Sequence, residues 1–359
     1  MKRHWTRRLA ALLLAMGGAT LAQGAAAEKV TLAFPIGITG QYSDFTYGIE
    51  LGFFAEEGIE LEMVSLQGSA VLIPQLINGS VDFGLGNPDV PLLPLAKGEP
   101  IPVRFVYNYL RRSVYEYSVM ADSKVKTVAD LKGKTLGIGA LTWGNIPMTK
   151  SILKESGVTW QKDIEVVPVG TGPAAWKQLE TGKVDVLAFF TSEHEKMRAA
   201  GLNIRLLDYP QKYQVLFSSG MMASVDTIEK RPELVAKMGR AMAKMTVACA
   251  ANRDACARSF WSKFPASKPA PDQEATWIAN TKKLLEGNYR SLSFFSGGKE
   301  RWGAFLPESW KVHMEVLHAG GIIPTTELDL DKLYTNRFVD EYNKFDRDAV
   351  IAKAKASGK

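Results

Sequence analysis

From Thr31 onward, short apolar runs alternate with longer amphipathic stretches, and residues that favour turns separate them. The run Asn87–Asp89 supplies a helix cap, a proline at the first helical position and an acid in the first turn, and Gly98 marks the end of that helix. Ser192 and Glu195 form a capping box at the start of a later helix. This repeated order of strand, turn and helix predicts an α/β fold with mostly parallel sheet.

The pattern also repeats over a longer distance. Gly79–Asp82 reads Gly-Ser-Val-Asp and Gly182–Asp185 reads Gly-Lys-Val-Asp, an offset of 103 residues, and the same offset separates Gly98 from Gly201. Shared turn chemistry is the alternative explanation for part of this match. We interpret the repeat as two similar α/β lobes, which predicts a bilobal protein.

In parallel sheets, ligands bind beyond the carboxyl ends of the strands, where loops lead into helix N-termini with free N–H groups. These loops are the candidate binding face, and they comprise residues 37–47, 67–70, 86–89, 140–145, 170–172 and 191–192. For any single residue the alternative is that it only caps a helix.

Aromatic residues gather in the same loops. Tyr42 and Trp143 follow matched positions of the two halves, so we expect them to face each other across a cleft and to enclose a planar part of a ligand. Phe45 and Tyr47 are expected to be core residues of the first helix.

Four charged residues lie near the predicted site. Asp44 and Asp89 favour a hydrogen-bond donor on the ligand, or they are solvated acids in the first turn of a helix. Arg111 and Arg112 are placed to clamp an anion, or they form a solvated pair.

The first 27 residues have the layout of a secretory signal peptide. Basic residues from Lys2 to Arg8 precede an apolar run, and small residues end at Ala27 before Glu28. The apolar run has about 13 residues, whereas a membrane anchor, the alternative, needs about 20. No cysteine lies near the cleavage point, so we expect a free exported protein cleaved after Ala27 and not a lipoprotein.

The composition excludes several classes of protein. A chain of 359 residues with 46% hydrophobic and 23% charged residues is globular, and it is long enough for two cores. The net charge of +6 depends on the four basic residues of the leader: 44 − 4 = 40 bases remain against 38 acids, a net of +2. A basic nucleic-acid face is therefore not expected.

Cys249 and Cys256 are the two cysteines of the chain. On one continuous helix they would lie about 10.5 Å apart along the axis, too far for a disulfide. Asn252 and Asp254 offer a helix stop and a new cap between them, which favours a fold-back and a disulfide in an oxidising compartment. The four histidines lie elsewhere, so no metal site is expected.

Catalytic motifs are not found. Gly170-x-Gly172-x-x-Ala175 resembles a dinucleotide fingerprint, but no acid ends the following strand. The chain has no phosphate-binding G-x-x-x-x-G-K-[ST], no G-x-S-x-G and no H-E-x-x-H motif. We expect no catalytic residues and no cofactor.

Three phrases carry a family resemblance: Gly52–Leu61 (GFFAEEGIEL), Gly79–Gly84 (GSVDFG) and Asp130–Gly137 (DLKGKTLG). In this order and spacing they resemble the periplasmic solute-binding proteins of ABC importers. The subgroup that they resemble most binds nitrate, taurine and alkanesulfonates, and thiamine-precursor pyrimidines. The resemblance covers roughly residues 29–225.

The resemblance implies a bilobal periplasmic-binding-protein fold, with two α/β lobes, a cleft between them and a helical C-terminal region. Residues 28–113 plus 221–359 would form one lobe and residues 114–220 the other, with crossings near residues 115–120 and 215–223. It also implies hinge closure on a small solute, a periplasmic location, the transmembrane permease subunits of an ABC importer as partners, and a monomer.

The resemblance also implies a set of ligand contacts: Gly40, Gln41, Tyr42, Asp44, Asn87, Pro88, Asp89, Thr142, Trp143, Gly144, Asn145, Thr171 and Gly172. Trp143 stands where sulfonate-binding relatives usually carry small hydroxyl residues. This departure disfavours a small inorganic anion and favours a larger planar ligand: an aromatic acid, of the sulfonate or carboxylate type, or a pyrimidine.

The expected function is therefore capture of a small organic solute for import. Two alternatives stay open at this point. One is an enzyme similar to thiamine-pyrimidine synthases, although those carry a cysteine-rich iron motif and this chain has no adjacent cysteines. The other is an exported ligand sensor for a membrane receptor.

Overall fold

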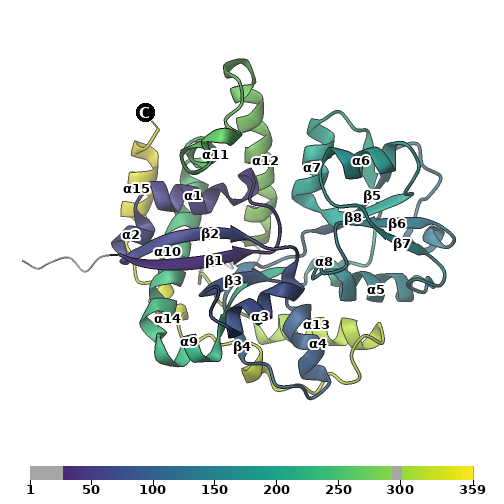
Figure 1. The fold of residues 1–359 in the computed structure, drawn as a ribbon, viewed down its shortest axis with the longest axis horizontal. Coiled ribbons are helices and arrows are strands. Elements are labelled where there is room, and N and C mark those ends of the chain that lie inside the picture. The colour runs from purple at the N-terminus through teal and green to yellow at the C-terminus, as the bar shows by residue number, and fades with distance from the viewer. Residues whose placement is uncertain (1–26, 293–300, 359) are drawn as a thin grey trace, which may run out of the picture.

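A computed structural model describes residues 27–292 and 301–358. The predicted signal peptide, apart from Ala27, lies outside the described residues. Two five-stranded sheets occupy separate halves of the molecule (Figure 1). We call the half built on the first sheet lobe 1 and the half built on the second sheet lobe 2.

The sheet of lobe 1 has the strand order β2-β1-β3-β10-β4. Strands β1, β2 and β3 are parallel, and β10 runs antiparallel to β3 and β4. The strands span Glu28–Phe34 (β1), Ile59–Ser65 (β2), Phe83–Gly86 (β3), Val103–Leu110 (β4) and Ser219–Ser224 (β10). The side chains of β3, β4 and β10 are almost entirely buried, whereas only Ile59 and Leu61 are buried in the edge strand β2.

The sheet of lobe 2 has the order β7-β6-β8-β5-β9. Strands β6, β7 and β8 are parallel, and β5 runs antiparallel to β8 and β9. The strands span Tyr115–Met120 (β5), Thr135–Ile138 (β6), Glu165–Pro168 (β7), Val186–Phe190 (β8) and Ile204–Leu206 (β9).

The predicted repeat is confirmed by this pairing. In each lobe the first parallel strand lies between the second and the third, and an antiparallel strand follows. The matched aspartates also make the same bond: the Thr31 backbone N–H donates to Asp82 at 2.9 Å, and the Thr135 N–H donates to Asp185 at 2.9 Å. Each carboxylate fixes the third strand of its lobe against the start of the first.

The helices pack around the two sheets. Lobe 1 contains α1 (Ser43–Glu50), α2 (Phe53–Glu56), α3 (Leu72–Ile77), α4 (Asp89–Ala96), α9 (Val225–Lys230), α10 (Pro232–Ala251), α14 (Val339–Tyr342) and α15 (Arg347–Ala356). Lobe 2 contains α5 (Ile146–Glu155), α6 (Pro173–Glu180), α7 (Thr191–Ala199) and α8 (Gln211–Gln214). As predicted, Phe45 and Tyr47 are core residues of the first helix.

The predicted fold-back at the cysteines is confirmed. Helix α10 ends at Ala251, and α11 (Arg253–Lys263) begins after Asn252, whose side chain accepts a hydrogen bond from the Ala255 N–H. This turn brings the Cα atoms of Cys249 and Cys256 to 5.1 Å, and the two residues form a buried disulfide.

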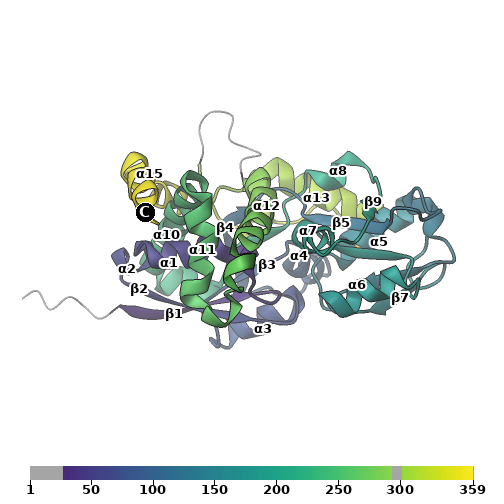
Figure 2. The same ribbon diagram turned by 90° about the horizontal axis from the view of Figure 1, so that it is seen from above.

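Two later helices contact both lobes. Helix α12 (Glu274–Leu292) packs on α11 and also on α7 of lobe 2 (Figure 2). Helix α13 (Pro307–Ala319) places Trp310 in the core of lobe 1 and Val316 against the core of lobe 2. The C-terminal part of the chain therefore joins the lobes.

The chain passes from lobe 1 to lobe 2 through residues 111–114, between β4 and β5, and returns through residues 215–218 before β10. Strand β5 itself pairs only within lobe 2, so the first crossing lies just before the range that the resemblance implied. None of the helices described is both long enough and apolar enough to cross a membrane.

Candidate ligand-binding cleft

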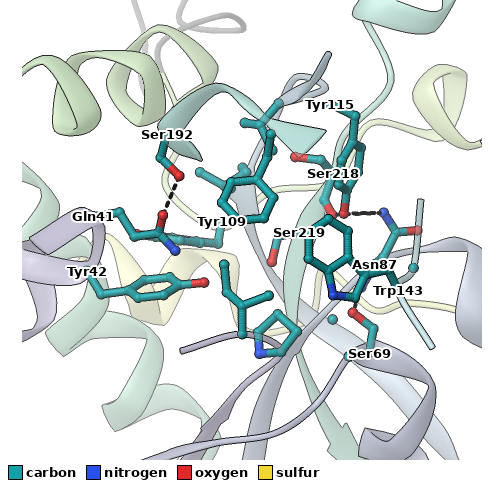
Figure 3. A pocket seen from close by; sticks show the side chains of 18 residues that line it. Gln41, Tyr42, Ser69, Asn87, Tyr109, Tyr115, Trp143, Ser192, Ser218 and Ser219 are labelled. Atoms are coloured by element: carbon teal, nitrogen blue, oxygen red, sulfur yellow. Dashed lines mark hydrogen bonds between the residues drawn. The ribbon is translucent and has the colours of Figure 1, made fainter. Parts of the chain in front are cut away.

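A pocket lies between the two lobes at the carboxyl ends of their parallel strands, as the pattern predicted (Figure 3). Its free space is about 690 Å³, including the part that is open to solvent. Its described lining consists of Pro35, Ile36, Gln41, Tyr42, Gly68, Ser69, Gly86, Asn87, Tyr109, Leu110, Val114, Tyr115, Trp143, Gly144, Phe190, Ser192, Ser218 and Ser219.

The lining is mostly apolar, and its polar side chains are uncharged. None of its described residues is Asp, Glu, Lys, Arg or His; the polar groups are amides, hydroxyls and backbone groups. Burial raises the pKa of Tyr42 and of Tyr115, so both phenols keep their protons across the physiological range. Among the described residues, no group of three or more His, Cys, Asp or Glu is arranged to hold a metal ion.

Trp143 forms an aromatic wall on the lobe 2 side. Its ring centroid lies 5.4 Å from that of Phe190 and 5.7 Å from that of Phe189. The indole also lies directly over Gly139, because a Cβ atom at that position would come within 1.8 Å of the ring. The missing side chain of Gly139 therefore lets Trp143 lie against the backbone and leaves the indole 9% exposed.

Tyr42 lies in the lobe 1 wall of the same pocket (Figure 3). Its ring packs edge-on against Phe34 at 4.6 Å. The structure thus brings the two aromatic residues of the predicted sandwich into one pocket, and each ring is held by neighbours of its own lobe.

Four hydrogen bonds hold Asn87 in place. Its side-chain Nδ2 donates to the Tyr115 hydroxyl at 3.1 Å and to the Ser218 carbonyl at 3.2 Å, and its Oδ1 accepts from the Asp89 N–H at 3.0 Å. Its backbone N–H donates to Ser69 Oγ at 3.4 Å. This amide is therefore fixed in one orientation at the base of the pocket.

A second contact joins the lobes inside the pocket. The Ser192 hydroxyl, in the first turn of α7, donates to Oε1 of Gln41, which lies in the short 3-10 helix Gly40–Tyr42 (Figure 3). Gln41 belongs to lobe 1 and Ser192 to lobe 2, so this bond spans the cleft.

Asp44 does not line the pocket, and it is not a solvated acid. It is 2% exposed, and the hydroxyl of the pocket residue Tyr109 donates to its Oδ2 at 2.7 Å. Burial raises the pKa of Asp44 to about 7, while hydrogen bonds from Tyr109 and from the Phe45 N–H act in the opposite direction. Asp44 therefore orients Tyr109, a residue of the pocket wall, from a position outside the pocket.

Asp89 is also buried, which contradicts the alternative of a solvated acid. Its carboxylate hydrogen-bonds Nε2 of His313, a buried residue of α13. The contact fixes the start of α4, directly after the pocket residue Asn87, against the helix that joins the lobes.

The two arginines at the crossing point away from the pocket. Arg111 is buried, donates to the Arg301 carbonyl at 2.6 Å and lies over the Trp302 ring. Arg112 hydrogen-bonds the Gln214 carbonyl and lines a separate cavity. Arg111 is therefore not part of a solvated pair, and neither arginine lines the cleft pocket.

Five of the thirteen predicted contacts line the pocket: Gln41, Tyr42, Asn87, Trp143 and Gly144. The other eight lie outside the lining: Gly40, Asp44, Pro88, Asp89, Thr142, Asn145, Thr171 and Gly172.

Three of these eight have contacts that explain their position. Gly40 packs under α12, and Asn145 is buried at the start of α5. The Gly172 N–H, at the start of α6, donates to the Glu193 carboxylate at 2.7 Å, so this helix end is already occupied by an internal acid.

The sequence-based prediction missed the residues in and directly beside the two crossing segments, which form the wall between the lobes. They are Tyr109, Leu110, Val114, Tyr115, Ser218 and Ser219. In the sequence, β4 reads as a buried strand, and nothing in its pattern shows that its last residues face a cleft. The paired serines at the start of β10, Ser218 and Ser219, are the one signal that could have identified this wall.

Two relatives match the sequence. The riboflavin-binding protein RibY of Chloroflexus aurantiacus is 23% identical over 322 residues, which cover 87% of this chain and 86% of RibY. The formylaminopyrimidine-binding protein of Halalkalibacterium halodurans is 26% identical over 148 residues, 41% of this chain and 43% of that protein.

The fold matches solved solute-binding proteins. The alkanesulfonate-binding protein SsuA of Xanthomonas axonopodis pv. citri, solved with MOPS, gives a TM-score of 0.62 at 15% identity, over 86% of this chain and 98% of SsuA. Together with the two sheets and the cleft, this likeness identifies the periplasmic-binding-protein fold. The sequence model of the NMT1/THI5-like family matches residues 40–255, more than half of the chain, and the protein therefore belongs to this family.

Proposed function

We propose that this protein is the exported solute-binding component of an ABC import system, and that it captures an uncharged, planar nitrogen heterocycle of the pyrimidine or flavin type. The observation that carries this proposal is the described lining, in which amides and hydroxyls accompany Trp143 and Tyr42 without any acidic or basic side chain.

The uncharged lining separates this ligand class from acids. An anion that leaves water for a buried site needs a cation or several aligned donors to offset the loss of its hydration. Arg111 and Arg112, the cations nearest in sequence to the lining, are engaged elsewhere. Helix N-termini do adjoin the pocket, those of α4 after Asn87, α5 after Gly144 and α7 at Ser192, but no cationic side chain accompanies them in the described lining. We therefore expect aromatic carboxylates and sulfonates to bind less tightly than neutral heterocycles.

The pocket offers what a neutral heterocycle needs. Aromatic walls bury the two faces of a planar ring, and the acceptor capacity left on Asn87 Oδ1, with the hydroxyl groups of the lining, can pair with polar groups on its edge. The two sequence relatives are named for riboflavin and for formylaminopyrimidine, and both ligands contain such rings.

In this proposal, residues 28–113 plus 221–359 and residues 114–220 act as two lobes that close on the solute. Closure excludes water and strengthens each hydrogen bond to the ligand. The protein would work as a periplasmic monomer, after cleavage of the signal peptide, and would deliver the solute to permease subunits. An iron-dependent enzyme is disfavoured because both cysteines of the chain are joined in a buried disulfide.

A thermal-shift screen tests the proposal. The mature chain, residues 28–359, is refolded without reducing agent to remove any carried solute. It is then heated with riboflavin, neutral pyrimidines, aromatic carboxylates, taurine, alkanesulfonates and nitrate in separate samples. A ligand at 100 times its dissociation constant adds about 2.7 kcal/mol, a rise of a few degrees for a chain of this size.

We expect the unfolding temperature to rise with neutral heterocycles. A rise with taurine, alkanesulfonates or nitrate alone would keep the solute-binding function and contradict the ligand class.

A further inference from the structure

The two lobes also touch at the edge of the ligand pocket, through residues 67–70 of lobe 1 and residues 142–144 of lobe 2. The Thr142 hydroxyl donates to the Gln67 carbonyl at 2.5 Å, and the Ala70 N–H donates to the Thr142 carbonyl at 3.3 Å. We call these two segments the lobe clasp. Both bonds join a backbone atom of one lobe directly to the other lobe, so neither needs a ligand as a bridge.

Two glycines allow this approach. A Cβ atom at Gly144 would lie 2.3 Å from Cβ of Asn87, and a Cβ atom at Gly68 would lie 2.5 Å from the carbonyl oxygen of Thr142. Gly68 also has a positive φ of 104°, which favours glycine in any case. Gly144 has no such backbone requirement, so its missing side chain matters through the contact between the lobes.

Two further bonds across the cleft support the clasp. Ser192 donates to Gln41, and Asn87 donates to the Tyr115 hydroxyl of lobe 2. The closed arrangement is therefore held at several points by groups of the protein itself.

We infer that Gly68, Thr142 and Gly144 are positioning residues: they hold the lobes closed in the absence of solute and thereby set the affinity of the cleft. The first half of this inference is independent of the ligand, and the second half rests on the proposed function. If only the closed form binds tightly, the apparent dissociation constant equals the intrinsic constant divided by the closed fraction.

The test uses Gly144→Ala in the refolded, ligand-free mature chain. The added methyl group cannot fit between the closed lobes, whereas in an open form it would be free of Asn87. Gly37→Ala is the matched control, because Gly37 lies in a neighbouring loop where a Cβ atom meets nothing within 4 Å and its φ is not positive. Thermal unfolding of each variant checks that it has folded.

Spin labels on Glu60→Cys and Lys183→Cys, exposed sites on lobe 1 and lobe 2, report the distance between the lobes by pulsed electron resonance. In the wild type and in Gly37→Ala we expect a majority at the distance of the present structure. In Gly144→Ala we expect the majority at other, longer distances. Thr142→Val, which removes the hydroxyl bond to Gln67 and keeps the side-chain volume, should give a smaller shift in the same direction.

A wild type that is fully open without ligand would overturn the inference, and so would identical distance distributions in all variants. Because no ligand takes part in this readout, failure of the proposed ligand class leaves it unaffected. Once a ligand has been identified, the Gly144→Ala variant should bind it at least tenfold more weakly than Gly37→Ala does.

Discussion

Lobe 1 and lobe 2 end their third strands at equivalent places, β3 at Gly86 and β8 at Phe190, and the same aspartate bond fixes both strands from the other end. Beyond these ends the lobes differ. Lobe 1 continues with the amide of Asn87, whereas lobe 2 presents Phe190 with Trp143 packed against it.

The two halves of the repeat are therefore alike in the bond that anchors the third strand and differ in the loops that follow it. The anchor that positions each strand is the same, because it serves the core of each lobe. The loops beyond the strands line the cleft, and they place an amide there in lobe 1 and an aromatic wall in lobe 2.

Removal of the lobe 2 wall should have the largest effect. Trp143→Ala is expected to weaken ligand binding at least tenfold, because the ligand loses an aromatic surface that Phe189 and Phe190 now hold in place. Calorimetric titration measures this loss, and Trp143→Phe should recover part of it.

Trp176→Ala is the control for this variant. Trp176 lies in the same hydrophobic core as Trp143 but does not line the pocket. Each alanine variant should lose about 3–5 kcal/mol of stability, as buried tryptophans do. Equal losses of affinity in both would show that Trp143 acts only through the stability of lobe 2.

Asp44, behind the lobe 1 wall, should make stability depend on pH. Its pKa is about 7 in the folded protein and 3.8 without the protein environment, so the folded state holds this proton to a higher pH than the unfolded chain does. The free energy of unfolding should therefore fall as the pH rises from about 4 to about 7, by up to about 4 kcal/mol.

Urea unfolding at several pH values measures this slope. In Asp44→Asn, which keeps an oxygen for the Tyr109 hydroxyl, the part of the slope due to Asp44 should vanish. If the free energy of unfolding depended on pH equally in the wild type and in Asp44→Asn, Asp44 would be ionised in the folded state throughout this range.

The matched aspartates should give the smallest and most similar effects. Asp82→Ala and Asp185→Ala each remove the acceptor of a backbone N–H, a loss of about 1–3 kcal/mol. Asp82 also binds Arg231 at 2.8 Å, whereas Asp185 lies 3.4 Å from Lys134, so we expect the larger loss in lobe 1.

Hydrogen exchange at the Thr31 and Thr135 amides locates each effect in its own lobe. If one substitution proved neutral, the two anchors would not be equivalent.

The sequence predicted the features that depend on local pattern. The repeated Gly-x-Val-Asp phrase indicated two lobes, and Asn252 indicated the turn that joins Cys249 to Cys256. It also placed the pocket at the carboxyl ends of the strands, where Gln41, Asn87 and Trp143 are found.

The features that it did not predict depend on contacts between distant segments. Asp44 and Asp89 read as ligand contacts or as solvated first-turn acids, because their partners Tyr109 and His313 lie 65 and 224 residues away. Tyr115 read as a strand residue, since the side of a crossing segment that faces the cleft is decided by the packing of both lobes.

The proposed preference of this cleft for uncharged rings can be measured with matched pairs of ligands that differ only by a charged group. Calorimetric titration of the refolded mature chain compares uracil with orotate, which is the same ring with a carboxylate, and riboflavin with its 5′-phosphate. The uncharged lining predicts that at least one neutral compound binds, and that it binds at least tenfold more tightly than its charged partner. Tighter binding of the charged member of a pair, or binding of alkanesulfonates alone, would contradict the account.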